Sequence, residues 1–237
     1  TRTESDLIGS REVPESALYG VQTLRGIENF RISKFHLNEY PLFIQALAIT
    51  KMGAAVANRE LDLLTEEQTD AILRACKEIL EGKHHEQFPV DMIQGGAGTT
   101  TNMNINEVVA NRALELMGHQ RGEYQYCSPN DHVNRSQSTN DAYPTAIHIG
   151  LYYTHLKLVK HFEVLIEAFR KKGSEFAHII KMGRTQLEDA VPMTLGQTFN
   201  GFASILEHEV KNLDFAAQDF LTVNMGATAI GTGITAE

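Results

Sequence analysis

Apolar residues recur at steps of three and four positions along most of this chain, which is the spacing of one face of an α-helix. From Pro41 onward, Phe43, Leu47 and Met52 fall on roughly one such face. The preceding segment is less regular, and residues 19–23 could form a short strand or an extended entry to the helical part. The pattern therefore predicts that regular helix begins at Pro41.

Two shorter helices are predicted next. Residues 65–68, Thr-Glu-Glu-Gln, match a capping box, in which the first and last side chains satisfy free backbone amides. Apolar positions at helical steps continue from there to Gly82, a residue that can end a helix. A further helix is predicted from Asn104 to Met117, and it is again followed by a glycine.

The second half of the chain predicts two much longer helices. Apolar positions keep helical steps over Thr145–Ile180, a length of about 50 Å at about 1.5 Å per residue. The last helix is predicted to begin at Pro192, which suits a first turn, and to run toward Asn224. Residues 225–237 are rich in glycine and threonine and are expected to form a loop. Helices of this length are typical of bundles.

Strands and helices do not alternate along the sequence, so a doubly wound sheet is not expected. The fold class is therefore predicted to be all-α, that is, mainly helical. We expect an N-terminal, mainly helical domain at residues 1–140. The beginning of a central bundle of long helices is expected at residues 141–237.

Charge and composition exclude several classes of protein. The 237-residue chain carries 21 Lys and Arg against 30 Asp and Glu, a net charge of −9, which argues against a general nucleic-acid binder. The first residues are polar and no run of about 18 apolar residues occurs, so neither a signal peptide nor a transmembrane helix is expected. Two cysteines, Cys76 and Cys127, favour a reducing, cytoplasmic location, with Cys76 a small core residue.

Three segments rich in hydroxyl and amide side chains carry the candidate chemistry: residues 94–104, 134–141 and 182–187. The first is rich in glycine, but it lacks both the lysine of a P-loop and the third glycine of a dinucleotide fingerprint. Each segment shortly precedes a predicted helix, and helix N-termini hold carboxylates through free amides and a partial positive charge. Helix capping explains each segment alone, whereas the three together suggest a shared anion site. No set of metal ligands is visible.

The same segments resemble the aspartase/fumarase superfamily. The matching motifs are residues 96–107 (GAGTTTNMNINE), 136–141 (SQSTND) and 183–187 (GRTQL). The resemblance extends over essentially the whole chain, from residues 19–25 (YGVQTLR) to residues 226–233 (GATAIGTG). Three linked motifs in the right order leave little room for chance similarity.

Within the superfamily, the sequence resembles the aspartate ammonia-lyase branch more than the fumarases. Ser128 stands where fumarases of this type carry a histidine before Pro-Asn-Asp, and Gln186 follows Thr185 where they carry a second histidine. Some aspartases also have Thr-His, so this difference argues against a fumarase more than it defines a subgroup. Two alternatives stay open: a fumarase-type hydratase and a catalytically silent helical scaffold.

The resemblance implies the reversible elimination of ammonia from L-aspartate to give fumarate, without an organic cofactor. Preorganised neutral donors would stabilise the negative charge that grows on the β-carboxylate. The substrate-binding residues it implies are Thr99, Ser138, Thr139, Asn140, Thr185 and Gln186. The first three would hold the β-carboxylate, Thr185 the α-carboxylate, and Asn140 and Gln186 would face the amino group. Arg25 is a weaker candidate for carboxylate binding, with a structural ion pair as the alternative.

The resemblance also implies that the chain is incomplete. A further loop of the superfamily, of the type Gly-Ser-Ser-x-Met-Pro, supplies the serine base, and no such segment occurs before Glu237. No catalytic base is therefore expected within this chain, which we predict to be inactive alone. Members of the superfamily form homotetramers whose active sites take loops from three subunits. The last helices of a chain that ends here would expose an apolar stripe, which predicts either a partner chain that covers it or poor solubility.

Overall fold

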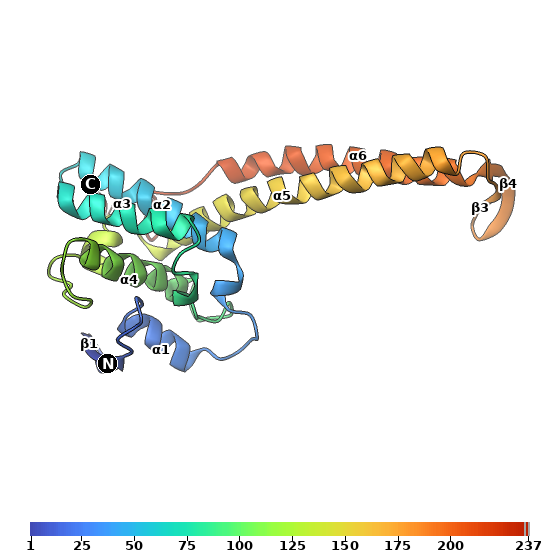
Figure 1. Cartoon of the computed structure of the whole chain (residues 1–237). Coiled ribbons are helices and arrows are strands. Elements are labelled where there is room, and N and C mark those ends of the chain that lie inside the picture. The colour runs from blue at the N-terminus through green and yellow to red at the C-terminus, as the bar shows by residue number, and fades with distance from the viewer. Residues whose placement is uncertain (235, 237) are drawn as a thin grey trace. The chain divides into compact units, whose positions relative to one another are not determined.

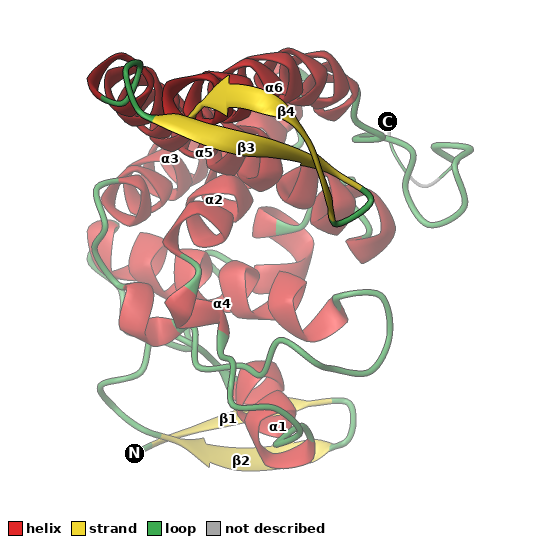
Figure 2. Ribbon diagram, turned by 90° about the vertical axis from the view of Figure 1, so that its right-hand side faces the viewer, coloured by secondary structure: helices red, strands yellow, loops and turns green. Residues whose placement is uncertain are grey.

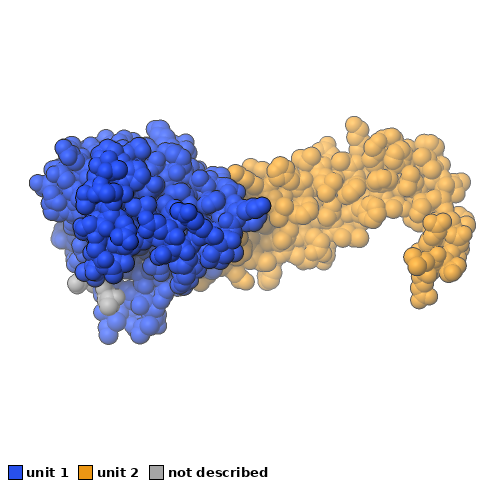
Figure 3. All heavy atoms as spheres, turned by 90° about the horizontal axis from the view of Figure 1, so that it is seen from below, with its two compact units in different colours: residues 1–150, 223–237 blue, residues 151–222 orange. Residues whose placement is uncertain are grey.

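The computed structural model describes residues 1–234 and 236 (Figure 1). The chain divides into two compact units, drawn in different colours in Figure 3. The first unit comprises residues 1–150 with 223–237, and the second comprises residues 151–222. The boundary between them falls inside a single helix, α5 (Thr139–Glu175). Compactness alone does not identify folding domains, so the division at residue 140 stays a prediction.

Three helices form the core of the first unit: α2 (Pro41–Glu60), α3 (Glu66–Leu80) and α4 (Thr99–Leu116). The predicted helix start at Pro41 is confirmed. The capping box is also confirmed, because Gln68 N donates to Thr65 Oγ1 over 3.2 Å and Thr65 N donates to Gln68 Oε1 over 3.1 Å. The buried side chains of this core include Leu47, Ile72, Cys76, Ile79, Val108 and Leu114. The interpretation of the cysteine among them as a small core residue is therefore confirmed.

The irregular first segment forms a hairpin and a short helix. Strand β1 (Arg2–Asp6) pairs antiparallel with β2 (Gly9–Val13), and both contact α1 (Val21–Asn29) (Figure 2). The prediction of a strand or an extended entry at residues 19–23 is wrong, because helix α1 begins within that segment.

The N-terminus of α1 is held by two carboxylates that are distant in the sequence. Glu107 of α4 accepts hydrogen bonds from the backbone N–H groups of Gly20, Gln22 and Thr23, over 2.8, 2.8 and 3.0 Å. Glu4 of β1 accepts from the Val21 N–H over 2.9 Å. Burial raises the pKa of Glu107, which is 2% exposed. These carboxylates take the place of a local capping side chain, so α1 depends on tertiary contacts.

Both helices that carry candidate residues begin earlier than the apolar pattern predicts. Helix α4 begins at Thr99, where residue 104 is predicted, and it follows Gly98 in the left-handed region at φ 87°. Helix α5 spans Thr139–Glu175, where Thr145–Ile180 is predicted. The polar first turns do not follow the apolar period, because polar side chains can be buried there through hydrogen bonds. In α4, Thr101 Oγ1 accepts from Gln94 and Asn102 Nδ2 donates to Thr139.

The second unit consists of two antiparallel helices joined by a strand hairpin. The C-terminal part of α5 runs beside α6 (Leu195–Ala217), and strands β3 (Ile180–Thr185) and β4 (Glu188–Thr194) connect them (Figures 1 and 2). The predicted helix start at Pro192 is wrong, because Pro192 lies in β4. The helix starts after Thr194, whose side chain forms a capping box with the residue three positions later.

Aromatic side chains fill the contact between the two helices of the second unit. The ring of Phe169 lies 6.0 Å from that of Phe199 and 5.7 Å from that of Phe202, measured between centroids. Gly196 lets the helices approach closely, since a Cβ there would overlap the carbonyl oxygen of Gly173 in α5. Large apolar side chains nevertheless stay exposed, as predicted, and they include Val164, Ile180, Val191, Ile205 and Phe215.

The predicted fold class is confirmed, because helices dominate and the sheets found in residues 1–234 are two-stranded. Short helical turns complete the chain: η1 (Leu37–Glu39), η2 (His85–Gln87), the π-helical η3 (Pro129–Val133) and η4 (Gln218–Leu221). After η4 the described residues form a loop, as predicted. Within the part of the chain that the structure describes, we find no helix with both the length and the hydropathy of a membrane span.

Candidate active site

The start of α5 presents a serine hydroxyl that already serves as a hydrogen-bond acceptor. Ser138 Oγ accepts from the backbone N–H of Asn140 over 3.2 Å, and the Ser138 N–H donates to Asp141 Oδ1 over 2.9 Å. Asp141 is fully buried, and its other oxygen accepts from the Thr228 N–H over 2.9 Å. Because the N–H of the helix occupies the serine oxygen as an acceptor, the serine O–H proton remains to be donated to a ligand.

The neighbouring threonine has the same arrangement. Thr139 Oγ1 accepts from Asn102 Nδ2 over 3.3 Å, and Asn102 is buried in α4. The O–H proton of Thr139 is therefore also available as a donor. Two neutral O–H donors thus lie at the positive end of the α5 dipole, where a carboxylate is stabilised.

Asn140 connects the same turn to the loop that follows η4. Pro144 lies inside α5 and has no N–H, so the Asn140 carbonyl lacks its usual helical partner. The side-chain amide of Asn224 donates to that carbonyl over 3.1 Å, and Asn140 Nδ2 donates to the Ala229 carbonyl over 2.8 Å. The second bond orients the Asn140 amide, which leaves Oδ1 as the atom suited to accept from a ligand amino group.

Thr99, the first residue of α4, lies beside this turn. The preceding Gly98 packs on the ring of Tyr143 in α5 so closely that a Cβ would overlap the ring carbons. Thr99 is exposed, and it lies three residues before Asn102, hence on the same face of α4. Four of the predicted site residues are therefore brought together where α4 and α5 begin: Thr99, Ser138, Thr139 and Asn140.

A buried lysine that the sequence did not single out lies behind this group and reaches it through Asn102, which donates to Thr139. Lys51 of α2 is 0% exposed. Its Nζ donates to three side-chain amide oxygens, those of Asn102, Asn134 and Gln137, over 2.8, 3.1 and 2.8 Å. The position of Lys51 in the sequence could have indicated its burial, because it follows Leu47 by one helical turn on the apolar face of α2.

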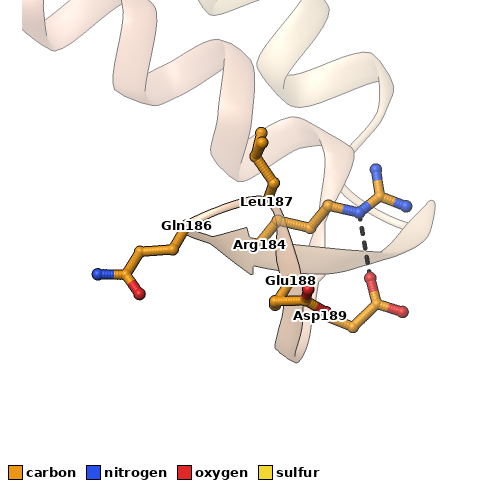
Figure 4. A pocket seen from close by; sticks show the side chains of 5 residues that line it. All are labelled: Arg184, Gln186, Leu187, Glu188 and Asp189. Atoms are coloured by element: carbon orange, nitrogen blue, oxygen red, sulfur yellow. Dashed lines mark hydrogen bonds and ion pairs between the residues drawn. The ribbon is translucent and has the colours of Figure 1, made fainter.

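The third predicted loop belongs to the second unit and does not precede a helix. Thr185 ends β3, and Gln186 and Leu187 form the turn to β4 with φ angles of 50° and 69°. All three are exposed, the Gln186 side chain extends away from the hairpin, and Arg184 pairs with Asp189 over 3.1 Å (Figure 4). The expectation that this loop directly precedes a helix is wrong, because the β4 strand follows it and α6 begins only at Leu195. The roles of its threonine and glutamine as ligand-binding residues stay a prediction.

The remaining ionisable candidate is engaged within the fold. Arg25 Nε and Nη2 donate to the two carboxylate oxygens of Asp6 over 2.8 and 2.9 Å, and Nη2 also donates to the Gly9 carbonyl. The hydrogen bond from Arg25 lowers the pKa of Asp6. Arg25 therefore makes the ion pair foreseen as the alternative to carboxylate binding. In residues 1–234 and 236, no group of three His, Cys, Asp or Glu side chains is placed to hold a metal ion.

Comparison with known sequences identifies relatives over the whole chain. The sequence profile of the family described as "Lyase" matches residues 9–237. An aspartate ammonia-lyase from Pseudomonas canavaninivorans is 58% identical over 237 residues, which are 100% of this chain and 50% of that protein. An aspartate ammonia-lyase from Escherichia coli K12 is 56% identical over 98% of this chain and 49% of its own length. The chain thus spans about half the length of the curated relatives it matches.

Solved structures with the same fold agree with that result. A fumarate lyase:delta crystallin from Brucella melitensis, in a crystal structure with bound cobalt, has a TM-score of 0.94 and 51% identity. This match covers 100% of this chain and 51% of the Brucella chain. A class II fumarase from Schistosoma mansoni has a TM-score of 0.91 at 36% identity, over 100% of this chain and 50% of its own.

Proposed function

The chain belongs to the lyase family, and we propose that the complete natural protein eliminates ammonia from L-aspartate to give fumarate in a reversible reaction. The relatives named aspartate ammonia-lyase, at 56–58% identity, support this substrate over others of the family. The observation that carries the proposal is the pair of hydroxyls at the start of α5. Ser138 and Thr139 both accept a hydrogen bond within the fold, which leaves two O–H protons for one carboxylate.

These donors suit the charge changes of the reaction. A base removes a proton from the carbon beside the β-carboxylate, and that carboxylate takes up the electron pair as an aci-form with two negative charges. The pair then forms the carbon–carbon double bond while the carbon–nitrogen bond breaks and ammonia leaves. We assign Thr99, Ser138 and Thr139 to the β-carboxylate, because preorganised neutral donors bind the more highly charged form more strongly than the substrate.

The other groups of the substrate are assigned to the remaining predicted residues. Asn140 Oδ1 would accept from the substrate amino group, because the bond from Asn140 Nδ2 to Ala229 orients the amide. Thr185 would bind the α-carboxylate, and Gln186 would contact the amino group from the exposed β3–β4 turn. The base, a serine in the resemblance, is not assigned to any of the described residues, and we propose that this chain alone is inactive.

The second unit supports assembly into a larger complex. Its two helices leave Val164, Ile205 and Phe215 exposed by 67%, 60% and 82%, and large apolar side chains gathered on a surface are typical of an interaction site. We propose a homotetramer in which partner chains cover these side chains and the active sites take loops from different subunits. The two buried free cysteines are consistent with a cytoplasmic location, which is part of this proposal.

The first experiment uses the complete natural protein with fumarate and ammonium, and identifies the product by NMR. L-Aspartate is the expected product. The rival function is hydration of fumarate, and the similarity to the 36% identical fumarase supports it as the second candidate. Malate as the product would establish this function. No product from a folded protein would refute the lyase function and favour a silent scaffold.

Site variants then test the assigned residues. Ser138→Ala removes one of the two hydroxyl donors and is expected to lower kcat by a factor of about 100 to 1,000, or about 3 kcal/mol in the barrier. Ser174→Ala is the control, because the Ser174 hydroxyl bonds the carbonyl of Arg170 within α5 of the second unit. Unchanged turnover in Ser138→Ala would remove that serine from the site.

A further inference from the structure

The hydrogen bonds that Lys51 makes within residues 1–234 do not include a carboxylate. An ammonium group has three N–H donors, and each of them here meets a neutral amide oxygen instead of a carboxylate. Burial lowers the pKa of Lys51 to about 7, while Cys76 and Asp141 oppose that shift. An isolated buried charge is costly, so the ammonium form depends on the amide groups around it.

Asn102 joins this lysine to the candidate site. Its Oδ1 accepts from Lys51 over 2.8 Å, and its Nδ2 donates to Thr139 Oγ1 over 3.3 Å. Hydrogen bonds thus run in one direction, from the ammonium group through the amide to the hydroxyl. Successive bonds of this kind polarise one another, and the effect is greater in a buried environment of low dielectric.

We propose that Lys51 is a positioning residue that strengthens the Thr139 hydroxyl as a hydrogen-bond donor to the bound carboxylate. The inference rests on the proposed function for the identity of that carboxylate. The lysine charge polarises the Asn102 amide, the amide polarises the hydroxyl, and the hydroxyl donates to the ligand. No proton is transferred along this series. Because the carboxylate gains charge in the transition state, the contribution increases during the reaction and affects kcat more than KM.

A purely structural role for Lys51 predicts a different result. Lys51 also holds residues 134–137, and Asn58 of the same helix donates to the Arg135 carbonyl of this loop over 2.9 Å. If Lys51 only shapes the loop, its removal disturbs ligand contacts whether or not Thr139 has a hydroxyl. If it acts through Asn102, its removal matters only while that hydroxyl is present.

The test is a double-mutant cycle in the complete natural protein, with Lys51→Met, Thr139→Val and the two combined. We expect Lys51→Met to lower kcat for aspartate deamination by about 10- to 100-fold, while KM changes by less than about threefold. In the Thr139→Val background, the same lysine substitution is expected to lower kcat by less than about threefold. Equal factors in the two backgrounds would overturn the proposal.

A second variant keeps the test decisive if Lys51→Met does not fold. Asn102→Asp preserves the size of the side chain and can pair with Lys51, but it removes the N–H that reaches Thr139. We expect a loss of kcat similar to that of the lysine variant, and a folded Asn102→Asp protein with the original kcat would overturn the proposal. Thr50→Val is the matched control, since the buried Thr50 hydroxyl bonds the Ala46 carbonyl within α2, and its kcat should not change.

Fumarate binding distinguishes a failure of this inference from a failure of the proposed function. Calorimetric titration with fumarate measures the carboxylate site without turnover. If the unmodified protein does not deaminate aspartate, the proposed function fails, and the same cycle is read on the fumarate Kd, where the ground-state charge leaves a smaller expected factor of about two to three for Lys51→Met while Thr139 is present. Unequal factors in the two Thr139 backgrounds then support the inference, and equal factors overturn it. A folded protein that does not bind fumarate would overturn both.

Discussion

Glu107→Gln tests whether a remote carboxylate creates the start of α1. The substitution keeps the side-chain volume but replaces one acceptor oxygen by an NH₂ donor. In the more favourable orientation, the amide oxygen takes the place of Oε2, which accepts from Gly20 and Thr23, and the NH₂ group then faces the Gln22 N–H. That partly buried N–H loses its partner at a cost of about 1–3 kcal/mol, and two charge-assisted bonds become neutral at about 1 kcal/mol each.

The expected loss of about 3–5 kcal/mol is local, and hydrogen exchange measures it locally. A loss of 3 kcal/mol corresponds to exchange about 100-fold faster for the amides of residues 20–29, followed by mass spectrometry on the complete natural protein. Glu60→Gln, an exposed substitution at the end of α2, is the control and should leave that segment unchanged. Unaltered exchange of residues 20–29 in Glu107→Gln would refute the conclusion that this carboxylate holds the helix.

Three further predictions concern stability. Gly98→Ala should lower the thermal midpoint more than Gly118→Ala, by the equivalent of about 1–3 kcal/mol, since both positions have positive φ but only the first meets the Tyr143 ring. Burial alone would raise the pKa of Asp91, but the four hydrogen bonds that its carboxylate accepts outweigh this and hold the pKa at about 2. The stabilisation from the ionised carboxylate is therefore complete above about pH 4 and is lost as the pH falls through about 2. Asp91→Asn should therefore lower the urea midpoint at pH 6 and have little effect at pH 2, and an equal effect at both would contradict this assignment. Phe199→Ala, which removes contacts with three phenylalanine rings, should cost about 3 kcal/mol in the same urea assay, and an unchanged midpoint would show that these contacts contribute nothing.

Two features that depend on neighbours within three or four residues were predicted correctly, although the starts of α4 and α5 were predicted too late. The capping box at residues 65–68 involves two side chains of one helical turn, and the structure has both of its hydrogen bonds. The helical fold class also followed from spacing, because an apolar stripe at steps of three and four needs no knowledge of its partner. The motifs at residues 96–107 and 136–141 indicated the family and four residues that the structure brings together at the starts of α4 and α5.

Features that depend on distant residues were missed or placed wrongly. Helix α1 lacks a capping signal in its own sequence, because Glu107, more than eighty positions away, accepts its free amides. Pro192 has the properties of a first-turn residue, yet pairing with β3 places it in a strand. Lys51 follows the apolar period of α2, and only the packing of α2 against α4 and the loop before α5 gives its ammonium group three acceptors.

The physical distinction is one of range. Helical spacing and capping are set by backbone hydrogen bonds that close within one turn, so the order of residues is enough to predict them. Buried charges, remote caps and strand pairing require acceptors from other elements, and those are chosen by the competition among all possible packings of the chain. In this chain, the O–H donors of Ser138 and Thr139 were recognisable from motif alone, whereas the lysine behind them was revealed by the fold.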